Sequence, residues 1–453
     1  MNYTHFYFLG IGGIGMSAIA RYFKAKGFEV AGYDRVRSQL CKELEQEGIS
    51  IHYDDDVNLI PFAFLDKTKT LVVYTPAIPT DNLEFTHFVE QGFVIQKRAQ
   101  VLGEVTRIER GLCVAGTHGK TTTSTMTAHL LKQSHVDCNA FLGGISKNYT
   151  SNLLLSDKSD LVVIEADEFD RSFHHLAPYM AVITAVDADH LDIYGTHEAY
   201  LESFAHFTSL IQKGGCLIMK KGIELKPCLQ EGVKFYTYSA TETADFYAEN
   251  IQIGNGELHF DFVTPTSRIN DVNLGVPVLV NVENGVAAMA LAYLNGVTAD
   301  ELRAGMASFA GIRRRFDTHL KTDKLTIIDD YAHHPAEVLA SVRSVKALYA
   351  DKKVLGVFQP HLYSRTRDFY KEFAASLSYL DEVVLVEIYP ARELPIPGVT
   401  SQLIFDEVTC PLKTLTTKAE LIDLLKTKQF DVLLTVGAGD IDIYLPQIVE
   451  VFH

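Results

Sequence analysis

The feature that most constrains the fold is a strand that runs through a glycine-containing turn into a helix, over residues 114–123. Apolar residues 112–115 predict the strand, and a lysine followed by three threonines predicts the first helical turn. Glycines let backbone N–H groups approach an anion closely, and a helix N-terminus adds a partial positive charge. The stretch therefore predicts a phosphate-binding loop made of Gly116, Thr117, His118, Gly119, Lys120, Thr121 and Thr122.

The loop departs from the common G-x-x-x-x-G-K-[ST] spacing, because Val114 stands where the first glycine would be. An ordinary tight strand–helix turn is the alternative interpretation. For a phosphate loop, Lys120 supplies a mobile charge for phosphate oxygens, and the hydroxyl of Thr121 suits Mg²⁺.

Strands alternate with helices along most of the 453 residues, which predicts an α/β protein with parallel sheets. We expect a Rossmann-like domain over 1–110, a central P-loop ATPase-like parallel-sheet domain over 111–312, and a Rossmann-like domain over 313–453. A hairpin of strands 247–253 and 258–263 predicts a small antiparallel β-layer on the central domain. The other predicted strands used below are 5–9, 29–32, 70–74, 161–164, 181–186, 325–328, 354–358, 383–386 and 432–436.

A complete G-x-G-x-x-G fingerprint follows the first predicted strand. It contains Gly10, Gly12, Gly13, Ile14 and Gly15, and Asp34 follows the second strand. Taken alone, the pattern predicts a dinucleotide with Asp34 on a ribose hydroxyl, as in a nicotinamide-dependent oxidoreductase. A nucleotide-binding fold that holds a different ligand is the alternative.

Acidic residues follow two predicted strands of the central domain. Because the carboxyl ends of parallel strands share one edge, we expect Thr121, Glu165, Asp187 and His190 to face one pocket. Oxygen ligands with one imidazole beside a phosphate loop suit Mg²⁺ or Mn²⁺. Solvated acidic side chains and a capping or core histidine are the alternative.

Further polar residues lie at later element ends. Asn281 and Asn284, at the start of a predicted helix over 282–294, are either caps or a pair that binds a base. Three arginines at 313–315 form a solvated face or reach a phosphate from the interdomain linker. A cationic edge able to hold a carboxylate comprises His333, His334, His361, Arg365 and Arg367.

The net charge of −16 argues against a general nucleic-acid or anionic-membrane surface. The six cysteines form no C-x-x-C pair, and the sequence shows neither a signal peptide nor a stretch of membrane-spanning length. We therefore expect a cytoplasmic protein with no nucleic-acid or membrane partner. The residues alone indicate an ATP- and Mg²⁺-dependent kinase, NTPase or ligase, or a non-catalytic nucleotide-gated switch.

Motifs along the whole chain, in order, resemble the Mur ligases of bacterial peptidoglycan synthesis. They are Gly116–Thr122, Glu165–Asp170, Asp189-His190, Asn281–Asn284, Arg314–Phe316, Asp330–Pro335 and Phe358–His361. The loop 10–17 resembles the branch of this family that joins L-alanine to the carboxylate of UDP-N-acetylmuramate through an acyl phosphate. A recycling branch that attaches a tripeptide is the alternative within the family.

The resemblance implies a role for each candidate residue. Catalysis would involve Lys120, His190, Arg315, His333 and Arg365, and ATP would be bound by Gly116–Thr122, Asn281, Arg315 and Asp330. Metal ligands would be Thr121, Glu165 and His190, and the substrates would contact Gly10, Gly12, Gly13, Ile14, Gly15, Asp34, His334 and Arg365. We expect a monomer or a weak homodimer.

Two departures from the family pattern stand out. Relatives that act later in the pathway carry a metal-bridging carbamylated lysine, and residues 194–210 contain no lysine. Some relatives have arginine where Leu362 stands, so carboxylate recognition here would depend on Arg365 or Arg367.

Overall fold

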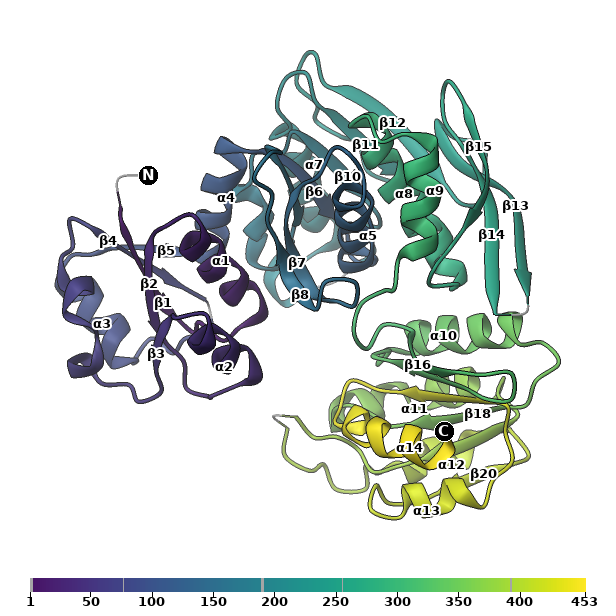
Figure 1. The fold of residues 1–453 in the computed structure, drawn as a ribbon. Coiled ribbons are helices and arrows are strands. Elements are labelled where there is room, and N and C mark those ends of the chain that lie inside the picture. Colours follow the sequence, from purple (N-terminus) through teal and green to yellow (C-terminus); the bar gives the residue numbers. More distant parts are fainter. Residues whose placement is uncertain (1–2, 76, 189–190, 255, 392) are drawn as a thin grey trace. The chain divides into compact units, whose positions relative to one another are not determined.

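The computed structural model describes residues 3–75, 77–188, 191–254, 256–391 and 393–453. It contains three β-sheets that follow one another along the chain, with helices between the strands (Figure 1). The predicted α/β class is confirmed. The chain divides into two compact units, one of Met1–Tyr247, Val263–Arg268 and Asn284–Gly305, and one of Ala248–Phe262, Ile269–Glu283 and Met306–His453. The boundaries at residues 110 and 312 stay predictions.

The first sheet has five parallel strands in the order β3-β2-β1-β4-β5. Its elements are β1 (His5–Leu9), α1 (Ile14–Ala25), β2 (Glu29–Tyr33), α2 (Gln39–Gln46), β3 (Ser50–His52), η1 (Val57–Leu59), η2 (Phe62–Leu65), β4 (Thr70–Tyr74), α3 (Leu83–Glu90), β5 (Val94–Lys97) and α4 (Arg98–Ile108). Figure 1 shows the strands between α3 on one side and α1 and α2 on the other. Strands β1 and β4 have the predicted bounds.

The second sheet has ten strands in the order β15-β14-β13-β12-β11-β10-β6-β9-β7-β8. Its elements are β6 (Arg110–Ala115), α5 (Lys120–Lys132), β7 (Asn139–Ser146), β8 (Ser151–Leu154), β9 (Leu161–Glu165), η3 (Phe169–His175), β10 (Met180–Ile183), α6 (Leu191–Tyr194), α7 (His197–Ser209), β11 (Cys216–Lys220), β12 (Lys234–Ser239), β13 (Phe246–Gly254), β14 (Glu257–Val263), β15 (Arg268–Asn273), α8 (Leu279–Leu294) and α9 (Ala299–Ser308). Strands β6, β9 and β10 are continuous apolar runs because strands buried on both faces need no polar side chains. The predicted hairpin strands are β13 and β14, which lie in this same sheet next to its edge strand β15.

The third sheet has the order β16-β17-β21-β18-β19-β20, with only β16 antiparallel to its neighbour. Its elements are β16 (Asp317–Lys321), β17 (Thr326–Asp330), α10 (Pro335–Leu348), β18 (Val354–Phe358), α11 (Tyr363–Leu377), β19 (Glu382–Leu385), α12 (Gln402–Glu407), β20 (Lys413–Leu415), α13 (Leu421–Lys426), β21 (Val432–Val436), η4 (Ile441–Tyr444) and α14 (Leu445–Phe452). Across the described ranges, no helix is both long enough and apolar enough to cross a membrane.

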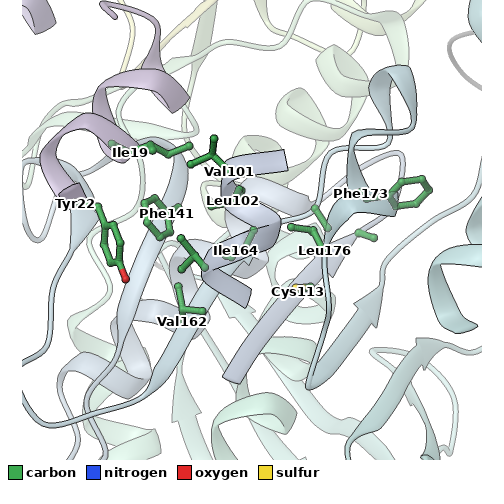
Figure 2. Packing of buried hydrophobic residues seen from close by; sticks show 14 of the residues in the cluster. Ile19, Tyr22, Val101, Leu102, Cys113, Phe141, Val162, Ile164, Phe173 and Leu176 are labelled. Carbon is green, nitrogen blue, oxygen red and sulfur yellow. The ribbon is translucent and has the colours of Figure 1, made fainter. Parts of the chain in front are cut away.

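A continuous hydrophobic core joins the first sheet to the second. Helix α1 contributes Ile19 and Tyr22, and the Tyr22 ring lies 5.2 Å from that of Phe141 on β7 (Figure 2). Val101 of α4 belongs to the same cluster as Ile164 of β9. Helix α1 is therefore packed against the second sheet, which fixes the turn that precedes it.

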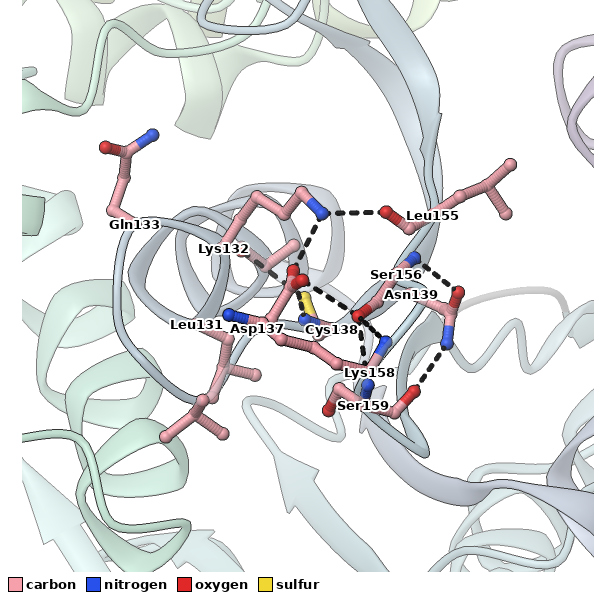
Figure 3. A network of polar contacts seen from close by, with 12 residues as sticks. Leu131, Lys132, Gln133, Asp137, Cys138, Asn139, Leu155, Ser156, Lys158 and Ser159 are labelled. Atoms are coloured by element: carbon pink, nitrogen blue, oxygen red, sulfur yellow. Dashed lines mark hydrogen bonds and ion pairs between the residues drawn. The ribbon is translucent and has the colours of Figure 1, made fainter.

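A polar network anchors the far end of α5, the helix that follows the predicted phosphate loop (Figure 3). Lys132 donates to Asp137 and to the carbonyl of Leu155, both at 2.7 Å, and Ser156 donates to Asp137 at 2.8 Å. Burial would raise the pKa of Asp137, but these donors lower it overall. The hydrogen bonds of Leu155 and Ser156 thus tie the end of α5 to the segment that leads into β9.

Three titratable side chains form a buried network in the first sheet. Tyr7 donates to Glu84 at 2.6 Å and contacts the His52 imidazole at 2.8 Å, and His52 lies 3.2 Å from Glu84. Burial raises the pKa of Glu84 to about 7 and lowers the pKa of His52. Both shifts favour the neutral forms, so we interpret the network as neutral hydrogen bonds and not as an ion pair.

We expect Glu84→Gln to flatten the pH dependence of stability. Because the folded pKa of Glu84 lies above its ordinary value, its contribution is fully present below about pH 4.5 and is lost as the pH rises through 7. The shift corresponds to at most about 3 kcal/mol. Denaturant unfolding at pH 5 and pH 8 measures the effect, with Glu90→Gln, an exposed change on the same helix, as the control. Parallel profiles for wild type and Glu84→Gln would contradict this prediction.

Candidate functional site

The turn between β6 and α5 exposes the start of the helix. Gly119 adopts φ 81°, a left-handed conformation that disfavours other residues, and it caps α5 without a side-chain hydrogen bond. The N–H groups of the first helical turn, which have no partner within a helix, are therefore directed to the loop. Thr184, just after β10, donates to the carbonyl of His118 and braces the turn. Such a site suits an anion.

Lys120 is held by three acceptors. Its ammonium donates to the carbonyls of Gly116 at 2.7 Å and Thr117 at 3.4 Å, and to the Glu168 carboxylate at 2.8 Å. The Glu168 side chain is only 1% exposed, and burial raises its pKa although Lys120 opposes the shift. The partner of the loop lysine was not predicted, because the acidic motif alone does not show which carboxylate turns inward.

The structure brings Thr121 and Glu165 together. The Thr121 hydroxyl donates to the Glu165 carboxylate at 3.1 Å, at the start of α5 and the end of β9. A hydroxyl and a carboxylate beside a phosphate loop are oxygen donors of the kind that Mg²⁺ takes, with phosphate and water completing its shell. The residues present therefore fit the metal.

Asp187, which was predicted to face the same pocket, makes contacts with the phosphate loop itself. Thr117 donates to the backbone carbonyl of Asp187 at 2.9 Å, and the exposed Asp187 carboxylate lies 3.7 Å from His118. His190 lies outside the described residues. Within the part of the chain that the structure describes, no three His, Cys, Asp or Glu side chains are grouped to hold a metal ion.

The glycine-rich turn before α1 is organised by Asp34. One Asp34 oxygen accepts the N–H of Gly12 at 2.8 Å, and the other accepts the N–H of Val36 at 3.0 Å. Gly13 caps α1 without a side-chain hydrogen bond. The predicted residues Gly10–Gly15 thus lie together at the N-terminus of α1. Asp34 holds this turn by accepting a hydrogen bond from its backbone.

At the carboxyl edge of the third sheet, a second group of predicted residues meets. Arg365 lies 3.4 Å from the Nδ1 of His361, and the rings of His333 and His361 are 5.9 Å apart. Burial, with the charge of Arg365, lowers the pKa of His361 to about 4. Arg367 pairs with Asp368 on the exposed side of α11. This edge of the sheet therefore combines one arginine with imidazoles.

Asp330, at the end of β17, is another predicted residue of this compact unit. Burial raises the pKa of Asp330 to about 6, and the nearby charge of Arg315 opposes that shift. Arg314 instead donates to the carbonyls of Gly437 at 2.7 Å and Gly439 at 3.0 Å, which makes it a structural residue.

Two further predicted residues make local contacts. Asn281 donates to the carbonyl of Val276 at 3.2 Å, as a residue at a helix start does. The backbone N–H of His334, at the start of α10, donates to Glu337 at 3.2 Å, and the His334 ring lies 5.3 Å from that of Phe369. Their predicted ligand contacts stay predictions.

Three family models match the chain in succession. Residues 5–110 match the Mur ligase family, catalytic domain, residues 114–292 match the Mur ligase middle domain, and residues 314–439 match the Mur ligase, glutamate ligase domain. Together they span most of the sequence.

Individual relatives match from end to end. The UDP-N-acetylmuramate–L-alanine ligase of Parabacteroides distasonis is 65% identical, with 99% of this chain and 97% of the relative covered. The ligase of the same name from Flavobacterium johnsoniae is 47% identical over the same shares. The crystal structure of UDP-N-acetylmuramate-alanine ligase MurC from Thermotoga maritima is 27% identical, covers 99% of both chains and has a TM-score of 0.81.

We expect Gly143→Ala to weaken the binding of ATP measured with Mg²⁺ by about tenfold, the effect of losing one charged hydrogen-bonding group. A methyl group at Gly143, on β7, would collide with the Glu165 carboxylate and push it from Thr121. Calorimetry with Mg²⁺ and with EDTA separates metal-dependent from metal-independent ATP binding. Only the metal-dependent affinity should fall. In a Glu165→Ala background, Gly143→Ala should weaken ATP binding little further. Full additivity of the two changes would contradict an effect of Gly143→Ala through Glu165.

Proposed function

The chain belongs to the Mur ligase family, and from that premise we propose that it joins L-alanine to the carboxylate of UDP-N-acetylmuramate. The reaction consumes ATP and releases ADP and phosphate. The observation that carries the proposal is the 65% identity, over nearly the whole chain, to a relative named for this activity. A phosphate loop followed by a helix, with a carboxylate against its threonine, supports it. We place the activity in the cytoplasm, as expected from the sequence.

The chemistry explains why ATP is needed. A carboxylate is a poor electrophile because its charge repels a nucleophile and oxide is a poor leaving group. Transfer of the γ-phosphoryl group to a carboxylate oxygen gives an acyl phosphate and ADP. The alanine amine then forms a bond to the acyl carbon, the carbon–oxygen bond to phosphate breaks, and the amine loses a proton. Catalysis therefore consists largely of positioning and charge neutralisation.

The loop residues suit that task. The first-turn N–H groups of α5 bind phosphate oxygens. The Lys120 ammonium, which contacts Glu168 in the structure, turns to the β- and γ-phosphates. Thr121 and Glu165 would hold the metal, which would neutralise phosphate charge. His190, outside the described residues, is proposed as a ligand of a second metal.

The remaining contacts are proposed from the resemblance to the family. Arg315 reaches the γ-phosphate, and Asn281 and Asp330 hold the nucleotide. Arg365 and His333 hold the amino-acid carboxylate, and His334 lies at the same edge. The loop Gly10–Gly15, with Asp34 bracing it, binds the UDP part at the N-terminus of α1. Monomer or weak homodimer remains the expected state.

Phosphate release should require both UDP-N-acetylmuramate and L-alanine in addition to MgATP. The coupled step needs an amine to discharge the acyl phosphate, so omission of either substrate should leave release near background. Release with neither substrate would point to an NTPase or a nucleotide-gated switch and overturn the proposal. Replacing alanine by the tripeptide tests the recycling reaction, which should be much slower.

Lys120→Ala should lower turnover by at least about a hundredfold, since mutation of one preorganised charged donor costs about this much. The measurement is coupled ADP release at saturating substrates, and near-normal turnover would overturn the role of the loop. Lys132→Ala, at the far end of α5, is a control for a merely destabilised helix.

Arg365→Ala should raise the KM for L-alanine by about ten- to a hundredfold and leave the KM for ATP within about twofold, because a charged hydrogen bond to the carboxylate is lost. Arg367→Ala, two residues along the same helix, is the matched control, since its guanidinium pairs with Asp368 on the exposed side. Equal effects of the two changes would contradict the assignment of Arg365.

A further inference from the structure

Arg98, the first residue of α4, lies directly against the glycine-rich turn. A methyl group added at Gly15 would collide with one guanidinium nitrogen, and it would lie 3.2 Å from both the Cδ and the Cζ of Arg98. Gly15 is the second residue of α1, so its N–H is one of the helix donors without a partner inside the helix. The guanidinium therefore sits beside the start of α1, and glycine at position 15 provides the room.

On its other side, Arg98 faces the acidic segment after β9. Its Nη2 lies 3.5 Å from an oxygen of Asp167, two residues beyond the Glu165 that contacts Thr121. The same side chain thus touches the glycine-rich turn and the segment after β9, the strand whose Glu165 contacts the phosphate loop. In the proposed reaction, the muramoyl carboxylate has to reach that strand end.

The neighbouring cationic side chains make closer contacts with other residues than Arg98 does. Lys97 makes a short ion pair with Asp170 at 2.7 Å, and Arg107 on the same helix donates to the carbonyl of His175 at 3.2 Å. Among contacts of the described residues, Arg98 makes one long ion pair, and its side chain is 31% exposed. Since a guanidinium carries five N–H donors, most of its hydrogen-bonding capacity is available to a ligand.

The turn and the arginine are held in a fixed relation to the second sheet. Asn152 of β8 donates to the carbonyl of Ile14, and Arg21 donates to Asn152 at 3.1 Å. Helix α4 packs into the same hydrophobic core through Val101 and Leu102 (Figure 2). The position of Arg98 therefore follows from packing and not from a mobile surface loop.

We propose that Arg98 binds an anionic group of the nucleotide sugar, either the diphosphate or the muramoyl carboxylate, and positions it at the start of α1. The inference rests on the proposed function, which supplies the ligand. A planar guanidinium matches two oxygens of a phosphate or carboxylate, and the helix donors beside it add a partial positive charge. Asp167 orients the guanidinium and is itself oriented, because its other oxygen accepts the N–H of Phe169 at 3.0 Å.

The test compares Arg98→Ala and Arg98→Lys with wild type, by calorimetric binding of UDP-N-acetylmuramate and by steady-state kinetics. Arg98→Ala should weaken nucleotide-sugar binding and raise its KM by about ten- to a hundredfold, with the KM values for ATP and L-alanine nearly unchanged. Arg98→Lys should retain only part of the wild-type affinity for the nucleotide sugar, because an ammonium lacks the paired donors of a guanidinium. Equal binding by wild type and Arg98→Ala overturns the inference.

UDP-N-acetylglucosamine, which carries the diphosphate but no carboxylate, distinguishes the two anionic groups. Equal weakening of both nucleotide sugars by Arg98→Ala assigns Arg98 to the diphosphate. Weakening of UDP-N-acetylmuramate alone assigns it to the carboxylate. Either result supports the proposal, and the absence of any weakening opposes it.

Two further variants separate binding from structural damage. Gly15→Ala keeps the arginine but displaces it, so it should weaken nucleotide-sugar binding in the same direction. Arg107→Ala, on the same helix, should leave binding unchanged. If wild type binds neither nucleotide sugar, the proposed function fails. If wild type binds and both Arg98→Ala and Gly15→Ala bind as tightly, only the role of Arg98 fails.

Discussion

The buried pair between Lys120 and Glu168 is the interaction on which the phosphate loop depends. A carboxylate that is 1% exposed is stable in its charged form only with a partner close by, and Lys120 lies 2.8 Å away. Removal of either member leaves a buried, uncompensated charge, so the two act as a unit. The ion pair also positions the Lys120 ammonium next to the loop, where it donates to the carbonyls of Gly116 and Thr117.

The acidic segment after β9 connects this loop to the glycine-rich turn. Glu165 meets Thr121, Asp167 meets Arg98, and Asp170 meets Lys97. Asp170 and Arg171 adopt positive φ angles of 51° and 54°, a conformation that costs of order 1–3 kcal/mol per residue. The ion pairs at both ends of the segment hold it in this shape. The acidic segment thus contacts both the phosphate loop and the arginine that lies against the glycine-rich turn.

The sequence was sufficient for the fold class and for most strands, because buried parallel strands are continuous apolar runs. It was not sufficient where the chain turns toward a distant partner. The strand predicted over 181–186 ends at Ile183, because the carbonyl of Ala185 accepts the N–H of Thr117 from the phosphate loop. The juxtaposition of Thr121 and Glu165 followed from strand order, whereas the inward turn of Glu168 depends on a lysine 48 residues away.

At the carboxyl edge of the third sheet, the backbone of Leu362 positions the residues that follow it. Leu362, where some relatives have arginine, adopts φ 73°, and its N–H donates to the carbonyl of Tyr389 at 3.0 Å. Its strained backbone starts α11 and aims Arg365 toward His361. Because His361 has a pKa of about 4, it is neutral near pH 7 and contributes hydrogen bonds without charge. Arg365 therefore supplies a positive charge at this edge that does not depend on His361 titration above about pH 5.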